Sequence, residues 1–168
     1  KHPIMKKNLI IFFSLFIAIS LTSCDKEDDI RLSQVPDGVM ATFQSLYPQA
    51  EYVEWEKKKD YYVADFFSGG TDLQVWINKS GAWSMTESDV RFANLPEAVQ
   101  NAFKSSQYAD WHIEDLDKYE RTDRTFYLIE IEKKGQRDRK LFYAEDGKLL
   151  KDEHDRENDD VTPTTTFW

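Results

Sequence analysis

Cys24 is the only cysteine among the 168 residues, so its thiol has no partner for a disulfide bond within the chain. Directly before it stand Leu21, Thr22 and Ser23, an apolar residue followed by two small ones. Small residues at this place allow a signal peptidase to accommodate the backbone in a narrow site. The spacing predicts cleavage after Ser23, with Leu21, Thr22 and Ser23 as the cleavage motif.

An apolar run from Leu9 to Leu21 leads to this motif, and Lys6 and Lys7 precede it. The run is shorter than the roughly 20 residues that a membrane-spanning helix needs. Residues 1–23 are therefore predicted to be a signal peptide, with residues 1–4 an extension ahead of Met5. The motif is similar to the bacterial lipobox. The resemblance implies lipidation of Cys24, whose thiol takes a diacylglycerol and whose freed amine takes a further acyl chain, and several acyl chains hold a protein stably to a bilayer. The alternative is an uncleaved membrane anchor.

The residues that follow the cysteine, Asp25 to Asp29, are almost all acidic. A solvated tether over residues 24–33 accounts for this composition. The stretch is also similar to the acidic signals that direct Bacteroidetes lipoproteins to the outside of the outer membrane. We therefore expect a cell-envelope lipoprotein, secreted across the inner membrane and held at the outer membrane on its periplasmic or external side.

Net charge restricts the partners of the exported part. Cleavage after Ser23 would remove Lys1, Lys6 and Lys7, leaving 19 basic against 31 acidic residues and a formal charge of −12. So acidic a chain lacks the basic surface that nucleic acid requires, and anionic lipid would repel it. The expected partners are the membrane, through the lipid on Cys24, and an envelope protein or peptide.

Residues that could support catalysis or metal binding do not form a recognisable set. The histidines are His2, His112 and His154, and none has the spaced His or Cys companions of a metal site. His112 is expected in a strand and His154 in a solvated charged segment. Acidic pairs are too frequent in this composition to identify an acid–base pair. The sequence therefore predicts no metal, no cofactor and no enzymatic activity, with a glycan-acting enzyme as the remaining alternative.

An internal repeat organises the rest of the chain. The segment from Val35 to Phe43 matches the segment from Leu95 to Phe103, with an apolar residue, proline, an acid, valine and phenylalanine in the same order. The match resumes between residues 62–66 and 127–131, and the growing offset places an insertion in the polar stretch around Asp117–Thr125.

Each copy predicts one helix followed by three or four antiparallel strands. Proline suits a helix start because the first turn leaves its N–H unpaired in any case. The expected strands, short and rich in aromatic and β-branched residues, are 51–57, 61–67, 73–78 and 82–86 in the first copy and 111–116, 125–133, 139–144 and 148–151 in the second. The predicted fold class is α+β, with one curved sheet and both helices on one face. The units span 34–91 and 92–154, and residues 155–168 are expected to be a C-terminal tail.

Strand alternation predicts which side chains face away from the helices, because residues two apart share a face. Asp65 and Glu130 occupy matching positions and are assigned to the open face. Phe67, Trp76 and Phe142 then join them. Large exposed aromatic side chains among charges are typical of a contact surface. On this hypothesis Trp76→Ala would weaken partner binding without unfolding the protein. The alternatives are that a tail or long side chains cover these residues, or that the register is shifted by one.

Taken together, the proline-led helices, the meander and the turns at Gly81 and Gly147 resemble the PepSY-like family of small secreted Bacteroidetes proteins, which are similar in fold to β-lactamase inhibitor protein. The resemblance covers about residues 34–154 and implies tandem α+β units with a concave open face. It implies no defined activity. The binding loops of the inhibitor have no counterparts here, and its disulfides are absent.

The sequence thus predicts a lipid-anchored binding module of the cell envelope that holds a protein or peptide on the open concave face of its sheet. Two alternatives remain. One is a structural or assembly lipoprotein of the outer membrane, and the other is an inhibitor of a hydrolase such as a protease or β-lactamase.

Overall fold

The computed structural model describes residues 29–156 and 161–167. The predicted signal peptide, the cleavage motif Leu21, Thr22 and Ser23, the lipidation site Cys24 and the first half of the tether lie outside the described residues. No helix within the described ranges is long and apolar enough to cross a membrane.

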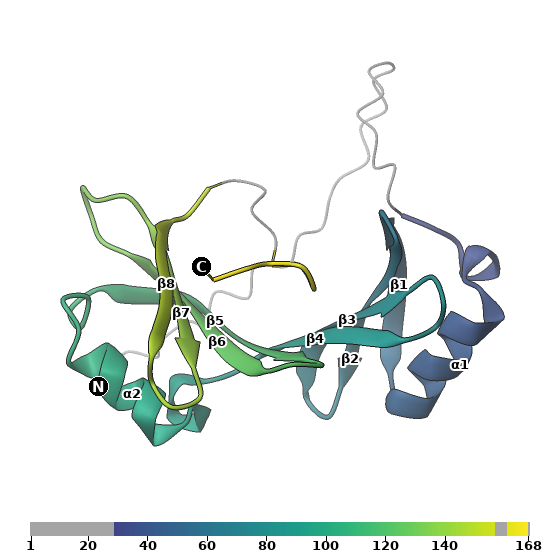
Figure 1. Ribbon diagram of the computed structural model, residues 1–168, viewed down its shortest axis with the longest axis horizontal. Coiled ribbons are helices and arrows are strands. Elements are labelled where there is room, and N and C mark those ends of the chain that lie inside the picture. Colours follow the sequence, from purple (N-terminus) through teal and green to yellow (C-terminus); the bar gives the residue numbers. More distant parts are fainter. Residues whose placement is uncertain (1–28, 157–160, 168) are drawn as a thin grey trace, which may run out of the picture.

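Two helices and eight strands make up the described part of the chain, in the order helix, four strands, helix, four strands (Figure 1). Short 3-10 turns, η1 (Leu32–Gln34) and η2 (Phe92–Asn94), precede the helices. The elements are α1 (Asp37–Leu46), β1 (Glu51–Lys58), β2 (Tyr61–Ser68), β3 (Thr71–Asn78), β4 (Trp83–Asp89), α2 (Glu97–Lys104), β5 (His112–Arg121), β6 (Thr125–Glu132), β7 (Arg139–Ala144) and β8 (Leu149–His154). The expected helix positions and the first three strands agree with these bounds to within a few residues.

Both helices begin directly after a proline, at Pro36 and Pro96, whose extended backbone forms the cap. An acidic residue in the first turn then interacts favourably with the positive end of the helix dipole. Each helix buries one valine and one phenylalanine four residues apart, which lie on the same helical face. The apolar faces of both helices therefore contact the same side of the sheet.

All eight strands form one antiparallel sheet in which neighbours in space are also neighbours in the chain. β5 joins the two halves. Its first residues pair only with β6, whereas Asp117 to Glu120 pair with β6 on one side and with β4 on the other, and Arg121 pairs with β4. The predicted strand 111–116 is too short, because residues 117–121 continue it as part of β5 and form the ladder to β4. The extra residues of the second copy, expected around Asp117–Thr125, lengthen the β5–β6 hairpin relative to the β1–β2 hairpin. Only residues 122–124 form a turn.

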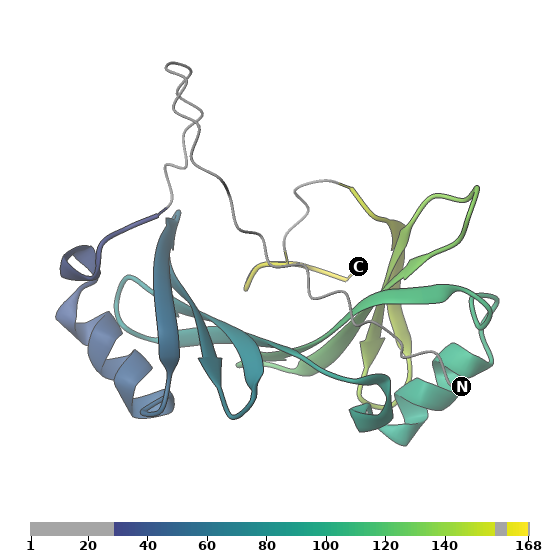
Figure 2. The same ribbon diagram turned by 180° about the vertical axis from the view of Figure 1, so that it is seen from behind.

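The sheet is strongly bent, with α1 and α2 outside the bend (Figures 1 and 2). Two buried clusters fill the space beneath the helices, one centred on Val39 and Phe43 and the other on Val99 and Phe103. A third cluster lies on the opposite, concave face and includes Trp76, Phe126 and Phe142. The C-terminal segment, residues 161–167, lies between the two arms of the bend in both views.

Gly81 and Gly147 occupy equivalent turns that press against the start of a helix. Both have positive φ, and a Cβ atom on Gly147 would lie 2.5 Å from the carbonyl oxygen of Ala98. A Cβ atom on Gly81 would lie 3.0 Å from the carbonyl oxygen of Gly38. Glycine is thus required at residue 147 both by the backbone conformation and by the close approach of helix α2.

Gly147→Ala is expected to lower the free energy of unfolding by roughly 3 kcal/mol, because backbone strain and a contact with a helix backbone add together. Gly135→Ala is the matched control, since Gly135 has the same kind of positive φ but nothing within 4 Å of its added Cβ. That variant should lose only about 1 kcal/mol. Urea unfolding followed by circular dichroism measures both. Equal losses for the two variants would contradict the importance of the contact with α2.

Candidate functional site

The five residues that the sequence assigns to the open face all lie on the side of the sheet away from the helices. Asp65 accepts a hydrogen bond at 2.8 Å from the side chain of Gln74, its partner on β3. Glu130 lies 3.3 Å from the amine of Lys140, its partner on β7. Trp76 and Phe142 belong to the concave cluster. The register that alternation predicts is therefore the one observed.

The expectation that Trp76 and Phe142 are exposed is wrong, since each side chain is only 2% exposed. Tyr61 packs edge-on against Trp76, with 5.7 Å between ring centroids, and the Lys58 amine lies 5.5 Å from the Trp76 ring. The amine of Lys151 lies 5.8 Å from the Phe142 ring. Long side chains and the C-terminal segment therefore cover Trp76 and Phe142, which was one of the alternatives that the sequence left open.

Phe67 is not brought together with the other aromatic residues. It is half-buried near the C-terminal end of β2, where it lines a separate hollow of about 320 Å³ with Tyr52, Asp65 and Asp72. The five predicted residues therefore do not form one patch.

The C-terminal segment, Val161 to Phe167, occupies the apolar part of the concave face. The ring of Phe167 lies 4.8 Å from that of Phe126 and 5.3 Å from that of Phe142, measured between centroids. Val161 is buried in the same cluster. The sequence does not identify the residues that make this contact, because residues 155–168 lack the periodicity from which the strands were predicted.

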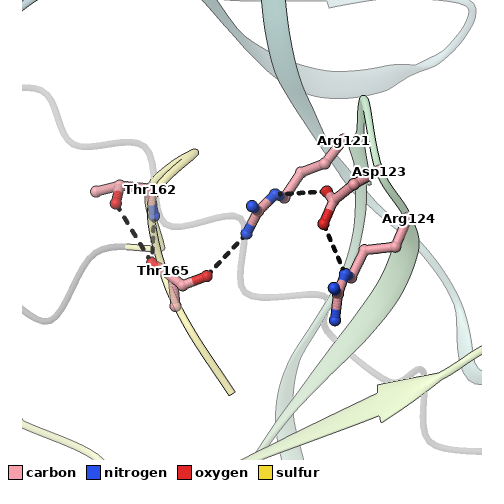
Figure 3. Close-up of polar contacts among 5 residues, drawn as sticks. All are labelled: Arg121, Asp123, Arg124, Thr162 and Thr165. Atoms are coloured by element: carbon pink, nitrogen blue, oxygen red, sulfur yellow. Dashed lines mark hydrogen bonds and ion pairs between the residues drawn. The ribbon is translucent and has the colours of Figure 1, made fainter. Parts of the chain in front are cut away.

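Polar contacts fix the same segment. Thr162 and Thr165 close a turn, in which the N–H of Thr165 donates to the carbonyl oxygen of Thr162 at 2.9 Å. The Arg121 guanidinium at the end of β5 donates to the carbonyl oxygen of Thr165 at 2.8 Å (Figure 3). Asp123 lies 3.2 Å from the same guanidinium and also accepts a hydrogen bond from Arg124 at 2.9 Å, which holds Arg121 in place (Figure 3).

An acidic cavity of about 180 Å³ adjoins this segment, and Val161 forms part of its wall. Its acidic lining residues come from β4, β5 and β6 and were not singled out in the sequence, apart from Glu130: they are Glu87, Asp115, Asp117 and Glu130. Tyr119, Lys58 and Lys140 complete the charged and hydroxyl-bearing lining. The cavity therefore lies where the two halves of the sheet join.

Burial and mutual repulsion shift the pKa values of these acids upward. Burial, followed by repulsion from Glu87 and Asp115, raises the pKa of Asp117 to about 8. Burial raises the pKa of Glu87 to about 7, against a hydrogen bond with Tyr119 that lowers it. The pKa of Tyr119 is raised by burial and by the same carboxylates, so this hydroxyl stays protonated.

Metal-ligand geometry is absent from the part of the chain that the structure describes: no three His, Cys, Asp or Glu residues are placed to hold one ion. His112 is exposed at the start of β5. His154 was expected in a solvated charged segment, but it is the last residue of β8 and its ring lies 3.3 Å from the Arg139 guanidinium.

A larger open groove of about 830 Å³ lies between α1 and the edge strand β1 and is lined mainly by apolar residues such as Met40, Phe43 and Val53. Trp55 also lines it, and its buried indole N–H has no hydrogen-bond partner among the described residues. The groove lies on the helix side of the sheet, opposite the concave face.

Known proteins share both sequence and fold with this chain. A family model described as "Putative beta-lactamase-inhibitor-like, PepSY-like" matches residues 21–68 and 60–151. A BLIP-like protein from Bacteroides fragilis NCTC 9343 is 30% identical with a TM-score of 0.71, and the match covers 77% of this chain and 94% of that chain. A DUF2874 family protein from Bacteroides ovatus ATCC 8483 is 34% identical with a TM-score of 0.67, covering 71% and 86%.

A third solved structure, from Bacteroides eggerthii DSM 20697 and described as "putative periplasmic proteins", is 28% identical with a TM-score of 0.68, covering 71% of this chain and 88% of that chain. No curated protein matches the sequence.

Proposed function

Because the chain belongs to the PepSY-like, β-lactamase-inhibitor-like family, we propose that it is a non-enzymatic binding module of the cell envelope that holds a protein or peptide on its concave sheet face. The proposal includes a lipid anchor on Cys24 and a place at the outer membrane. The periplasmic description of a structural neighbour supports an envelope location.

One observation supports the proposal: the concave face already holds a piece of polypeptide, the chain's own residues 161–167. This piece is bound as a peptide ligand would be, with one aromatic anchor and one main-chain hydrogen bond. Phe167 packs against the rings of both Phe126 and Phe142, and Arg121 donates a hydrogen bond to the carbonyl oxygen of Thr165. Aromatic anchors in buried pockets contribute most of the binding energy in protein interfaces.

The chain's own segment acts in this proposal as an occupant that a partner must displace. A covalently attached segment competes at an effective concentration in the millimolar range, so a partner must bind the face more strongly than residues 161–167 do. Weakening the attached segment should therefore make the face available to an added peptide.

A labelled synthetic peptide with the sequence of residues 161–168 provides the test. Phe167→Ala removes the aromatic anchor from the attached segment, so the variant is expected to bind the added peptide roughly tenfold more tightly than the unaltered chain does. Fluorescence anisotropy measures the two affinities.

Thr166→Ala is the matched control, since Thr166 belongs to the same segment but is exposed. It should bind the peptide as weakly as the unaltered chain. Equal binding to the Phe167→Ala variant and the control would overturn the proposal that this face takes a peptide from outside.

The family description favours one second candidate, an inhibitor of a hydrolase. In that case addition of the full chain to a β-lactamase or a periplasmic protease would lower the rate of hydrolysis, and Phe167→Ala would change the extent of inhibition. Unchanged rates across such a panel would count against it.

A further inference from the structure

Asp117 is the least compensated carboxylate on the concave face. It is 5% exposed, and no hydrogen bond or ion pair to its side chain is present among the described residues. Other carboxylates on this face do have polar partners: Asp65 accepts a hydrogen bond from Gln74, and Glu130 forms an ion pair with Lys140. A buried carboxylate without a partner is costly, so an arrangement of this kind suggests a ligand that supplies one.

The charged groups around Asp117 do not supply a partner. Those that face it are Glu87 and Asp89 on β4, Asp115 and Tyr119 on β5, Glu130 on β6, Lys140 on β7 and Lys58 on β1. Both lysines are engaged by other acids: Lys140 lies 3.3 Å from Glu130 and 3.0 Å from Asp155, and Lys58 lies 3.1 Å from Glu56. Among the described residues, the cavity wall is therefore lined by carboxyl groups without a basic partner of their own where Glu87, Asp115 and Asp117 meet.

The size of the cavity limits what it can hold. Its volume of about 180 Å³ is below the roughly 300 Å³ at which pockets for drug-sized ligands begin. It suits one side-chain group. The acids are not arranged as ligands of a single metal ion within the described residues, whereas several carboxylates spread over three strands suit the multiple N–H donors of a guanidinium or ammonium group.

We propose that this cavity binds the basic group of an arginine or lysine side chain that a partner polypeptide presents from the concave face. The inference rests on the proposed function, because Val161 forms part of the cavity wall and a polypeptide that replaced residues 161–167 would pass the cavity. The chain's own segment does not supply this group, since residues 161–168 contain no basic residue.

Protonation supports the same assignment. The pKa of Asp117 is raised to about 8 and that of Glu87 to about 7 by burial and by neighbouring carboxylates. Near neutral pH the cavity therefore holds protons in the absence of a cation. A bound guanidinium favours the ionised carboxylates and releases these protons, so binding should strengthen as the pH rises from 6 to 8.5.

The probes are N-acetylarginine N-methylamide and the citrulline analogue, which has a similar shape but no charge. They are titrated into the full chain and followed by NMR chemical shifts of the backbone amides of β4 and β5. The arginine probe is expected to bind roughly tenfold more tightly than the citrulline probe at pH 8.5, because a charged hydrogen bond is lost with citrulline. The preference should shrink at pH 6.

Asp117→Asn should abolish the preference for arginine, whereas Glu114→Gln, which removes an exposed acid from the same strand, should leave it unchanged. Equal binding of both probes to the unaltered chain, or an arginine preference that survives in Asp117→Asn, would overturn the assignment.

Failure of this experiment is distinguishable from failure of the proposed function. The peptide of residues 161–168 lacks a basic residue, so its binding to the Phe167→Ala variant does not depend on the cavity. Loss of arginine selectivity with peptide binding intact overturns the cavity alone. Arginine selectivity without peptide binding overturns the proposal that the partner is a polypeptide, and it indicates a small cationic molecule as the ligand.

Discussion

Asp117→Asn is expected to raise the free energy of unfolding by roughly 3 kcal/mol at pH 9 and by clearly less at pH 5. Asparagine keeps the shape of the side chain and removes the charge that the concave face does not compensate. If this substitution stabilises the protein, the native aspartate at residue 117 is unfavourable for folding.

The direction of the pH dependence follows from the pKa of Asp117, which is about 8 in the folded protein against an ordinary value of 3.8. Between these two values the unfolded chain has released a proton that the folded protein still holds. The free energy of unfolding therefore falls as the pH rises from about 4 to 8, and the loss is complete above pH 8. Glu87 adds a loss of the same sign up to about pH 7. The variant lacks the part due to Asp117.

Urea unfolding at a series of pH values between 5 and 9 measures the effect. Glu114→Gln serves as the control, and this exposed position should change stability by less than about 0.5 kcal/mol at every pH. A stability difference between Asp117→Asn and the unaltered chain that stays constant with pH would show that Asp117 is not a buried, uncompensated acid.

Trp76→Ala is expected to lower the free energy of unfolding by about 3–5 kcal/mol, because it empties a buried position in the concave cluster. The effect is the opposite of the sequence expectation, in which Trp76 was an exposed contact residue. The indole N–H donates to the Gln74 side chain at 2.7 Å, and Gln74 in turn donates to Asp65. Removal of the indole therefore also breaks a chain of hydrogen bonds.

Trp76→Phe separates packing from hydrogen bonding, since it keeps a ring but has no N–H donor, and it should cost about 1–2 kcal/mol. Tyr52→Ala is the control, because Tyr52 is 83% exposed. Denaturation followed by circular dichroism compares the three variants. If Trp76→Ala unfolds at the same urea concentration as Tyr52→Ala, the concave cluster does not contribute to stability.

Local patterns in the sequence predicted most of the fold. Proline followed by an acid and two apolar residues four apart located both helices, and alternation correctly assigned Asp65 and Trp76 to the open face. These features depend on residues close together in the chain, so the sequence records them directly.

Features that depend on distant residues were missed. The pairing of β5 with β4 continues through Asp117 to Arg121, a stretch whose polarity resembles a loop although it lies in the middle of the sheet. Phe167 meets Phe126 and Phe142 from a segment without periodicity. The candidate cavity was missed for the same reason, because Glu87 and Asp117 become neighbours only through the β4–β5 ladder.

The same ladder sets an order of events during folding. All seven hydrogen-bonded interfaces in this sheet connect strands that follow one another in the chain. Each can therefore form as soon as its own two strands are available, without a search for a remote partner. The concave face needs both halves of the sheet, so it is complete only after β4 has paired with β5. Residues 161–167 are therefore expected to reach their place last, and until then the newly folded sheet offers its concave face unoccupied.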